Sequence, residues 1–85
     1  MKEKSLFPKE IQRDYDWAFR NYHRLAKRYP ERWVAFAHQR VLASGPSLMP
    51  VLRKARRQKG APKGPHVPHL FVESEVHIYA HLHRA

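Results

Sequence analysis

The sequence contains no cysteine, which excludes a disulfide, a thiolate nucleophile and a cysteine-ligated zinc site. It also has no long apolar run. The longest, WVAFA at residues 33–37, is far shorter than the ~20 residues that a membrane-spanning helix requires. A glycine-rich phosphate loop, a nucleophile elbow and a metal-binding helix motif are all missing. We therefore expect a cytoplasmic protein with no membrane contact and no cofactor.

Acidic residues are scarce. Seven Asp and Glu residues stand against 17 Lys and Arg, which gives a formal net charge of +10 at pH 7. A chain with this balance attracts polyanions such as nucleic acid, and salt weakens the attraction.

A chain of 85 residues suits one small domain, which we place at residues 8–85 after an N-terminal extension of residues 1–7. Its core is small, so a homodimer interface would be a natural supplement.

The apolar residues between Pro8 and Tyr29 recur at alternating steps of four and three, which predicts one face of a helix. Pro8 suits the first helical position, and Pro30 prevents the helix from continuing. The apolar face comprises Ile11, Tyr15, Ala18, Tyr22, Leu25 and Tyr29.

Two short runs rich in β-branched and aromatic residues follow, at residues 33–37 and 40–45, and they predict a β-hairpin. Only His38 and Gln39 separate the two runs. This pair is not the Asn-Gly that a two-residue turn prefers. We therefore expect either a longer loop or a strained turn.

A second helix is predicted over residues 47–59, with Gly60 ending it. Residues 60–68, GAPKGPHVP, have too many prolines and glycines for regular structure and form an extended connector. From 69 to 83 apolar and polar residues alternate, which indicates one long strand or a hairpin that turns at 73–75. The order predicts an α+β domain: helix, β-hairpin, helix, then one or two C-terminal strands, in a single sheet with the helices on one face.

A folding pattern extends over residues 22–59: Tyr29, then WVAF, then VLASG, then a helix that begins near Ser47. It resembles a family of short prokaryotic domains of unknown function, in which an aromatic-Val-Ala strand and a strand ending in Ser-Gly form a hairpin that leads into a helix. The resemblance implies an α+β fold and a prokaryotic origin, and it supplies no catalytic residue. The His38-Gln39 turn and the basic second helix depart from the family pattern, where a glycine and acidic residues are more usual.

The positive charge is concentrated in residues 46–68, which hold six cations and no acidic residue. Cations that share one face of a helix are suited to contact the phosphates of nucleic acid. Each guanidinium group can donate two N–H hydrogen bonds to one phosphate. We therefore predict non-specific binding to the backbone of DNA or RNA. The main contributors are Arg53, Lys54, Arg56, Arg57, Lys59 and Lys63, and a second ridge of Arg20, Arg24 and Lys27 on the first helix flanks the nucleic acid.

A protein-interaction module is the main alternative, in which the first helix or the C-terminal strand pairs with another chain, including a second copy. Trp17 and Phe19 are candidates for stacking on bases. Their place beside the apolar face of the first helix favours core or interface positions instead.

Two chemical hypotheses also stay open. A metal site would need His81 and His83, completed by His69, by His66 or by a second subunit, although a histidine-rich exposed strand face explains the same pattern. A small ribonuclease would need a general acid, a general base and a cation for the phosphate. Its candidate residues are Glu73, Glu75, Tyr79, His81 and His83, with Arg57 as the cation.

Overall fold

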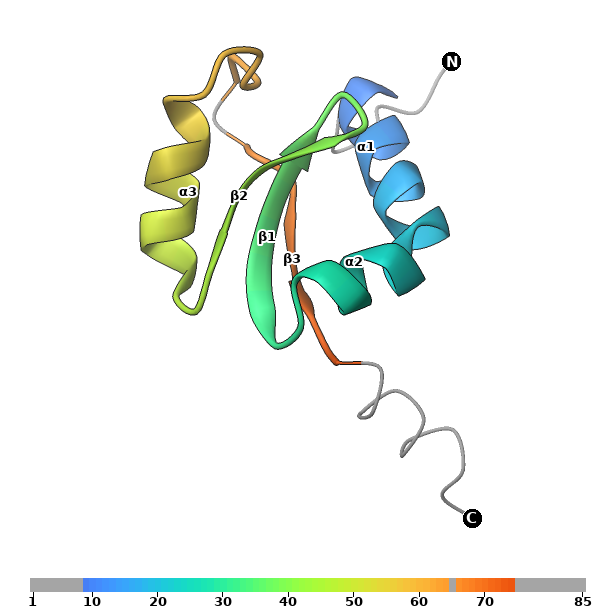
Figure 1. Cartoon of the computed structure of the whole chain (residues 1–85). Coiled ribbons are helices and arrows are strands. Elements are labelled where there is room, and N and C mark those ends of the chain that lie inside the picture. The colour runs from blue at the N-terminus through green and yellow to red at the C-terminus, as the bar shows by residue number, and fades with distance from the viewer. Residues whose placement is uncertain (1–8, 65, 75–85) are drawn as a thin grey trace.

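The computed structural model describes residues 9–64 and 66–74. Over this part of the chain, three strands form one antiparallel sheet in the order β2-β1-β3, with β1 in the middle (Figure 1). The predicted α+β class is confirmed. None of the helices in the described ranges is long and apolar enough to cross a bilayer. The elements are α1 (Lys9–Arg20), α2 (Tyr22–Arg28), β1 (Arg32–Ala37), β2 (Arg40–Gly45), α3 (Leu48–Arg56) and β3 (His69–Val72).

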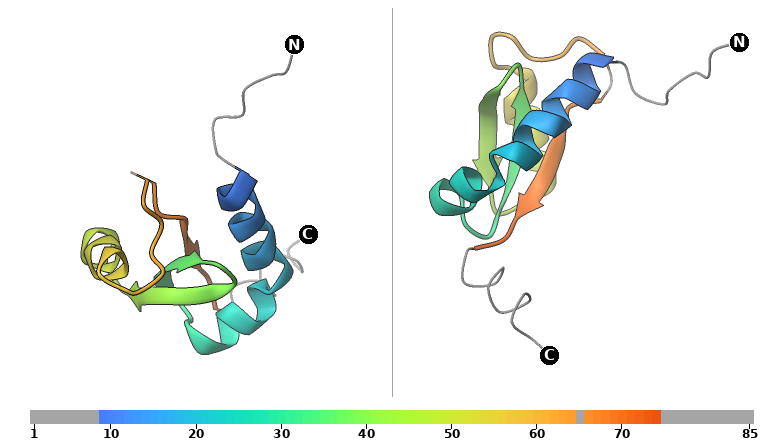
Figure 2. Two further views of the ribbon diagram at one scale, coloured as in Figure 1. Left: turned by 90° about the horizontal axis from the view of Figure 1, so that it is seen from above. Right: turned by 90° about the vertical axis from the view of Figure 1, so that its right-hand side faces the viewer.

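The helices lie on both faces of the sheet, so the prediction that they share one face is wrong. Ala35 and Ala37 of β1 pack with residues of α3, whereas Val34 and Phe36 pack with residues of α1 and α2. Figure 2 shows α3 on one side of the sheet and α1 with α2 on the other. The run WVAFA explains the difference, because a strand covered on both faces carries apolar side chains without alternation.

The predicted first helix is divided into α1 and α2 by a bend at Asn21. The side-chain amide of Asn21 donates a hydrogen bond to the Trp17 carbonyl at 2.8 Å. A side chain that binds a helix carbonyl competes with the regular backbone pattern and favours a bend. Because of the bend, α1 packs on β1 while α2 packs on β3. The predicted apolar face still points inward, with Ala18 and Leu25 buried.

The hairpin turn consists of His38 and Gln39 alone, and their φ angles are positive, 52° and 62°. Such a turn requires left-handed backbone at both positions, which residues other than Gly and Asn adopt at a cost of roughly 1–2 kcal/mol each. Of the two alternatives expected for this connection, the structure therefore has the strained two-residue turn and not the longer loop. The buried carboxylate of Asp14 on α1 stabilises the turn, because it accepts a hydrogen bond from the His38 N–H at 3.0 Å.

The second predicted helix is shorter than expected. α3 follows Ser47, as predicted, but ends at Arg56 instead of Lys59. Gly60 lies beyond it with a φ of 87°, a conformation that glycine adopts without strain. The alternating final segment is confirmed as a strand over β3. The choice between a hairpin and one long strand falls on residues 75–83, which lie outside the described residues.

Replacing Asp14 by alanine tests how much the turn depends on α1. We expect the free energy of unfolding to fall by about 1–3 kcal/mol, because the His38 N–H loses its acceptor in a partly buried place. Asp14→Asn retains a carbonyl oxygen there and should cost clearly less. Urea unfolding of both variants measures the difference, and equal losses would show that this hydrogen bond does not matter.

Candidate nucleic-acid interface

α3 has one apolar side and one cationic side. Val51 and Ala55 are buried against the sheet, and Leu52 is half-buried beside them. Arg53 and Arg57 lie four positions apart, so they share the side of the helix that faces away from the sheet. The exposed cations of α3 and of the segment after it are Arg53, Lys54, Arg56, Arg57, Lys59 and Lys63.

None of the acidic residues that the structure describes belongs to α3 or to the segment that follows it. α1, which carries three of them, packs on the opposite face of the sheet from α3. The sheet therefore separates the three carboxylates of α1 from the outer side of α3. The five acidic residues are Glu10, Asp14, Asp16, Glu31 and Glu73.

Two arginines hold the connector that follows α3. Arg56 donates from Nη1 to the Gly64 carbonyl at 3.3 Å, and the Arg40 guanidinium donates to the Lys59 carbonyl. Gly60 leaves room for this second contact, since a Cβ there would lie 2.9 Å from Nη2 of Arg40. Arg56 therefore positions the connector as well as adding charge. Sequence reasoning missed both roles, because each depends on where the connector folds back.

The second predicted ridge lies on the other face of the domain. Arg20 ends α1, and Arg24 and Lys27 belong to α2; all three side chains are exposed. The bend at Asn21, where Nη1 of Arg24 donates to the Asn21 side-chain oxygen at 3.2 Å, interrupts the helix face that the three were expected to share. Because α1 and α2 pack opposite α3, the two ridges do not form one surface.

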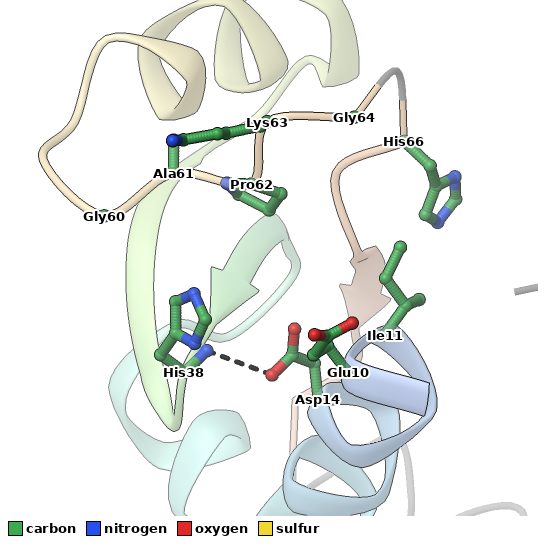
Figure 3. Close-up of a pocket in the computed structure, with 10 residues that line it drawn as sticks. All are labelled: Glu10, Ile11, Asp14, His38, Gly60, Ala61, Pro62, Lys63, Gly64 and His66. Atoms are coloured by element: carbon green, nitrogen blue, oxygen red, sulfur yellow. Dashed lines mark hydrogen bonds between the residues drawn. The ribbon is translucent and has the colours of Figure 1, made fainter. Parts of the chain in front are cut away.

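An open cavity of about 470 Å³ lies between the connector, the start of α1 and the β1–β2 turn (Figure 3). The carboxylates of Glu10 and Asp14 lie on one side of it, and Asp14 is already bonded to the backbone of His38. Lys63 lines the opposite side. Its side chain extends along the connector towards Ala61 (Figure 3), so Lys63 belongs to a cavity that carboxylates also line and lies apart from the outer side of α3.

His66 connects this cavity to α1. Its Nε2 lies 3.2 Å from the hydroxyl of Tyr15, and the same hydroxyl accepts a hydrogen bond from the His69 N–H at 3.3 Å. Burial, and to a lesser degree the neighbouring His69 ring, lower the pKa of His66. The neutral ring is thereby favoured, so His66 supports the packing of the connector and adds no positive charge to the surface near neutral pH.

The metal hypothesis gains no support within the described residues. No group of three or more His, Asp or Glu side chains in residues 9–64 and 66–74 is arranged to hold a metal ion. His69 lies with Nδ1 at 2.8 Å from the Val67 carbonyl, which occupies that nitrogen. His81 and His83 lie outside the described residues, so the site that includes them stays a prediction.

The ribonuclease hypothesis places Glu73 and Arg57 in one site, but the structure separates them. Glu73 follows β3 beside the start of β1, and its N–H donates to the Tyr22 hydroxyl at 2.9 Å. Arg57 follows α3, whose last turn lies towards the other end of the sheet, where the β1–β2 turn is found (Figure 1). The remaining candidates, Glu75, Tyr79, His81 and His83, lie outside the described residues.

The two aromatic residues considered for base stacking differ in their positions, and Trp17 lies where the sequence predicts it. Trp17 packs against the core, with its ring centroid 6.1 Å from that of Phe36, whereas the Phe19 side chain is 64% exposed. Trp33 and Phe71, which sequence reasoning did not select, lie together on the α3 side of the sheet with centroids 5.4 Å apart. Nothing in their local sequence distinguishes them from core residues, because their exposure depends on which strands α3 covers.

The fold and its acid-free helix define a small basic α+β domain with helices on both faces of a three-stranded sheet over the described ranges. Residues 24–67, a little more than half of the chain, match a family of unknown function, DUF5678, and the chain belongs to this family. The match extends from α2 through the hairpin and α3 into the connector, which confirms the predicted resemblance to a family of small domains of unknown function. No curated protein and no solved structure matches the chain.

The lowered pKa of His66 predicts how stability depends on pH. The unfolded chain protonates His66 at a higher pH than the folded protein does. The stabilisation from the neutral ring is therefore complete above pH 6.5 and is lost as the pH falls through the folded pKa. His66→Gln, which does not titrate, should lose less stability than the natural protein between neutral pH and about pH 5. Urea unfolding at both pH values tests this, and parallel losses in the two proteins would contradict it.

Proposed function

We propose that this chain is a nucleic-acid-binding module that contacts the phosphate backbone through the outer side of α3 without sequence preference. The observation that carries the proposal is that α3 has one side buried in the core and one exposed, basic side. The exposed side carries Arg53, Lys54 and Arg57, and neither α3 nor the segment after it contains an acidic residue. A helix fixed to the core on one side presents its cations in a constant arrangement. We also propose that the protein is cytoplasmic, as the sequence predicts.

The arrangement suits phosphates better than it suits base edges. Arg53 and Arg57 are separated by about 6 Å along the helix axis, at ~1.5 Å per residue. Guanidinium groups bond to phosphate through two N–H groups, and each phosphate that is neutralised releases counterions. α3 has no Asn, Gln or acidic side chain, the usual partners of adenine and cytosine edges, and we propose that its arginines bond to phosphates instead of guanine, so that the binding is general and salt-sensitive.

The nine cations selected from the sequence divide into three groups under this proposal. Arg53, Lys54, Arg57 and Lys59 form the proposed surface, and Arg56 contributes while it also holds the connector. Lys63 lines the cavity that Glu10 and Asp14 also line. Arg20, Arg24 and Lys27 lie on the opposite face and are left out of the surface.

A protein-interaction module is a second candidate, and two observations favour it. β2 and β3 are the outer strands of the sheet over the described residues, so a partner strand can add to either of them. Phe19 on α1 and Met49 on α3 are 64% and 61% exposed, so each offers a large apolar side chain that a partner can cover. A molecular mass that rises with protein concentration would favour this candidate, whereas a monomer at all concentrations would favour nucleic-acid binding.

Two triple variants with the same loss of charge test the proposed surface. The first is Arg53→Gln, Lys54→Gln and Arg57→Gln on α3, and the control is Arg20→Gln, Arg24→Gln and Lys27→Gln on the opposite face. The plot of log affinity against log salt has a slope of about 0.9 per phosphate contact on duplex DNA. The α3 variant should therefore flatten that slope by roughly 2–3 on unrelated sequences, while the control changes it little.

Glutamine keeps the helix and most of the side-chain stem, so a loss of binding reports charge and not unfolding. Far-UV circular dichroism confirms that each variant is folded. Equal weakening by the two variants would show that the net charge alone attracts the polymer, and α3 would then not be the site.

A further inference from the structure

One half of the sheet face beside α3 has no helix over it among the described residues. α3 packs on β1 and β2 but does not reach β3, whereas α1 and α2 cover the other face (Figures 1 and 2). Leu70 and Val72 of β3 face the α1 and α2 side and join its core. The alternate residues, His69 and Phe71, therefore face the α3 side, where none of the described helices covers them.

Three aromatic rings occupy this uncovered half. Trp33 of β1 pairs directly with Phe71 of β3, with ring centroids 5.4 Å apart, and lies 6.1 Å from the ring of His69. The Phe71 side chain is 39% exposed, and Trp33 and His69 are half-buried. Rings from two neighbouring strands therefore lie together on the side of the sheet that carries α3, and Phe71 is the most exposed of them.

These two features together fit one class of ligand. Bases stack on aromatic rings without regard to sequence, because every base has a π face, and cations along the same groove follow the phosphates. A duplex keeps its bases paired and stacked inside, so it can use only the cations. A single strand can use both surfaces. An apolar protein partner would use the rings but would gain nothing from the acid-free side of α3.

We propose that Trp33 and Phe71, with His69 beside them, form a stacking platform for the bases of single-stranded nucleic acid, whose phosphates contact the cations of α3. This inference rests on the proposed function and names its substrate class. It accounts for the exposure of Phe71, which would otherwise be an apolar ring in water at the edge of the sheet.

The two tryptophans of the chain lie on opposite faces of the sheet, which provides a direct reporter. Trp17→Phe leaves Trp33 as the only tryptophan, and Trp33→Phe leaves only Trp17. We expect oligothymidylate and oligouridylate to quench the fluorescence of Trp33 in the first variant and to leave that of Trp17 in the second variant unchanged. A duplex of the same length at the same salt concentration should quench Trp33 far less.

Phe71→Leu measures the energetic contribution of the platform. Leucine retains apolar bulk on β3 but cannot stack, so single-strand affinity should fall by about fivefold or more, the loss of one base stack. Duplex affinity should stay the same. The triple variant of α3 should weaken both, because both polymers present phosphates.

The failures of the two proposals are distinguishable. One outcome overturns the platform alone: both polymers bind equally, the fluorescence of Trp33 is not quenched, and Phe71→Leu binds like the natural protein. The phosphate surface of α3 then stands. If neither polymer binds, both proposals fail. If Phe71→Leu instead converts an oligomer to a monomer in analytical ultracentrifugation and leaves single-strand binding unchanged, the rings are an interface with a second copy, and the platform is overturned.

Discussion

The burial of β1 on both faces is the constraint from which the rest of the structure follows. Four consecutive residues, Val34 to Ala37, are fully buried, and successive side chains point to opposite sides of the sheet. Each side therefore needs its own cover, and the chain provides α1 with α2 on one face and α3 on the other. In a domain with such a small core, neither layer is dispensable. The same division places the acidic residues of α1 away from the outer side of α3, and α3 itself carries only basic charges.

The placement of α3 over β1 and β2 has a second consequence. Nine residues cover two strands of the sheet, and the chain then crosses to β3 through an extended connector instead of a longer helix. Arg40 and Arg56 hold that connector, and Tyr15 binds its end near His66. The uncovered part of the sheet and the cations of α3 therefore lie on the same side of the sheet, because α3 runs along β2 and β1 and, among the described residues, leaves β3 without a helix over it (Figure 1). We propose that function uses both.

Much of the local structure could be predicted from the sequence, because it depends on neighbours along the chain. The β-hairpin, α3 and the resemblance to a family of unknown function were all expected from the run at 33–37 and the residues after it. Interactions between distant residues were not accessible. The strained His38-Gln39 turn is stabilised by Asp14, 24 positions before His38, and the exposure of Phe71 depends on which strands α3 covers. The placement of helices on one face was a misreading, since an apolar run without alternation already indicates a strand covered twice.

The central claim, that nucleic acid binds on the α3 side of the sheet, is tested most directly by an amide NMR titration of the full chain with oligothymidylate. Backbone signals report each element separately, so the bound face can be identified without substitutions. We expect the shifts to concentrate in α3, in the segment after it and in β3, with α1 and α2 little affected. Shifts confined to α1 and α2, or spread evenly over both faces, would contradict the claim.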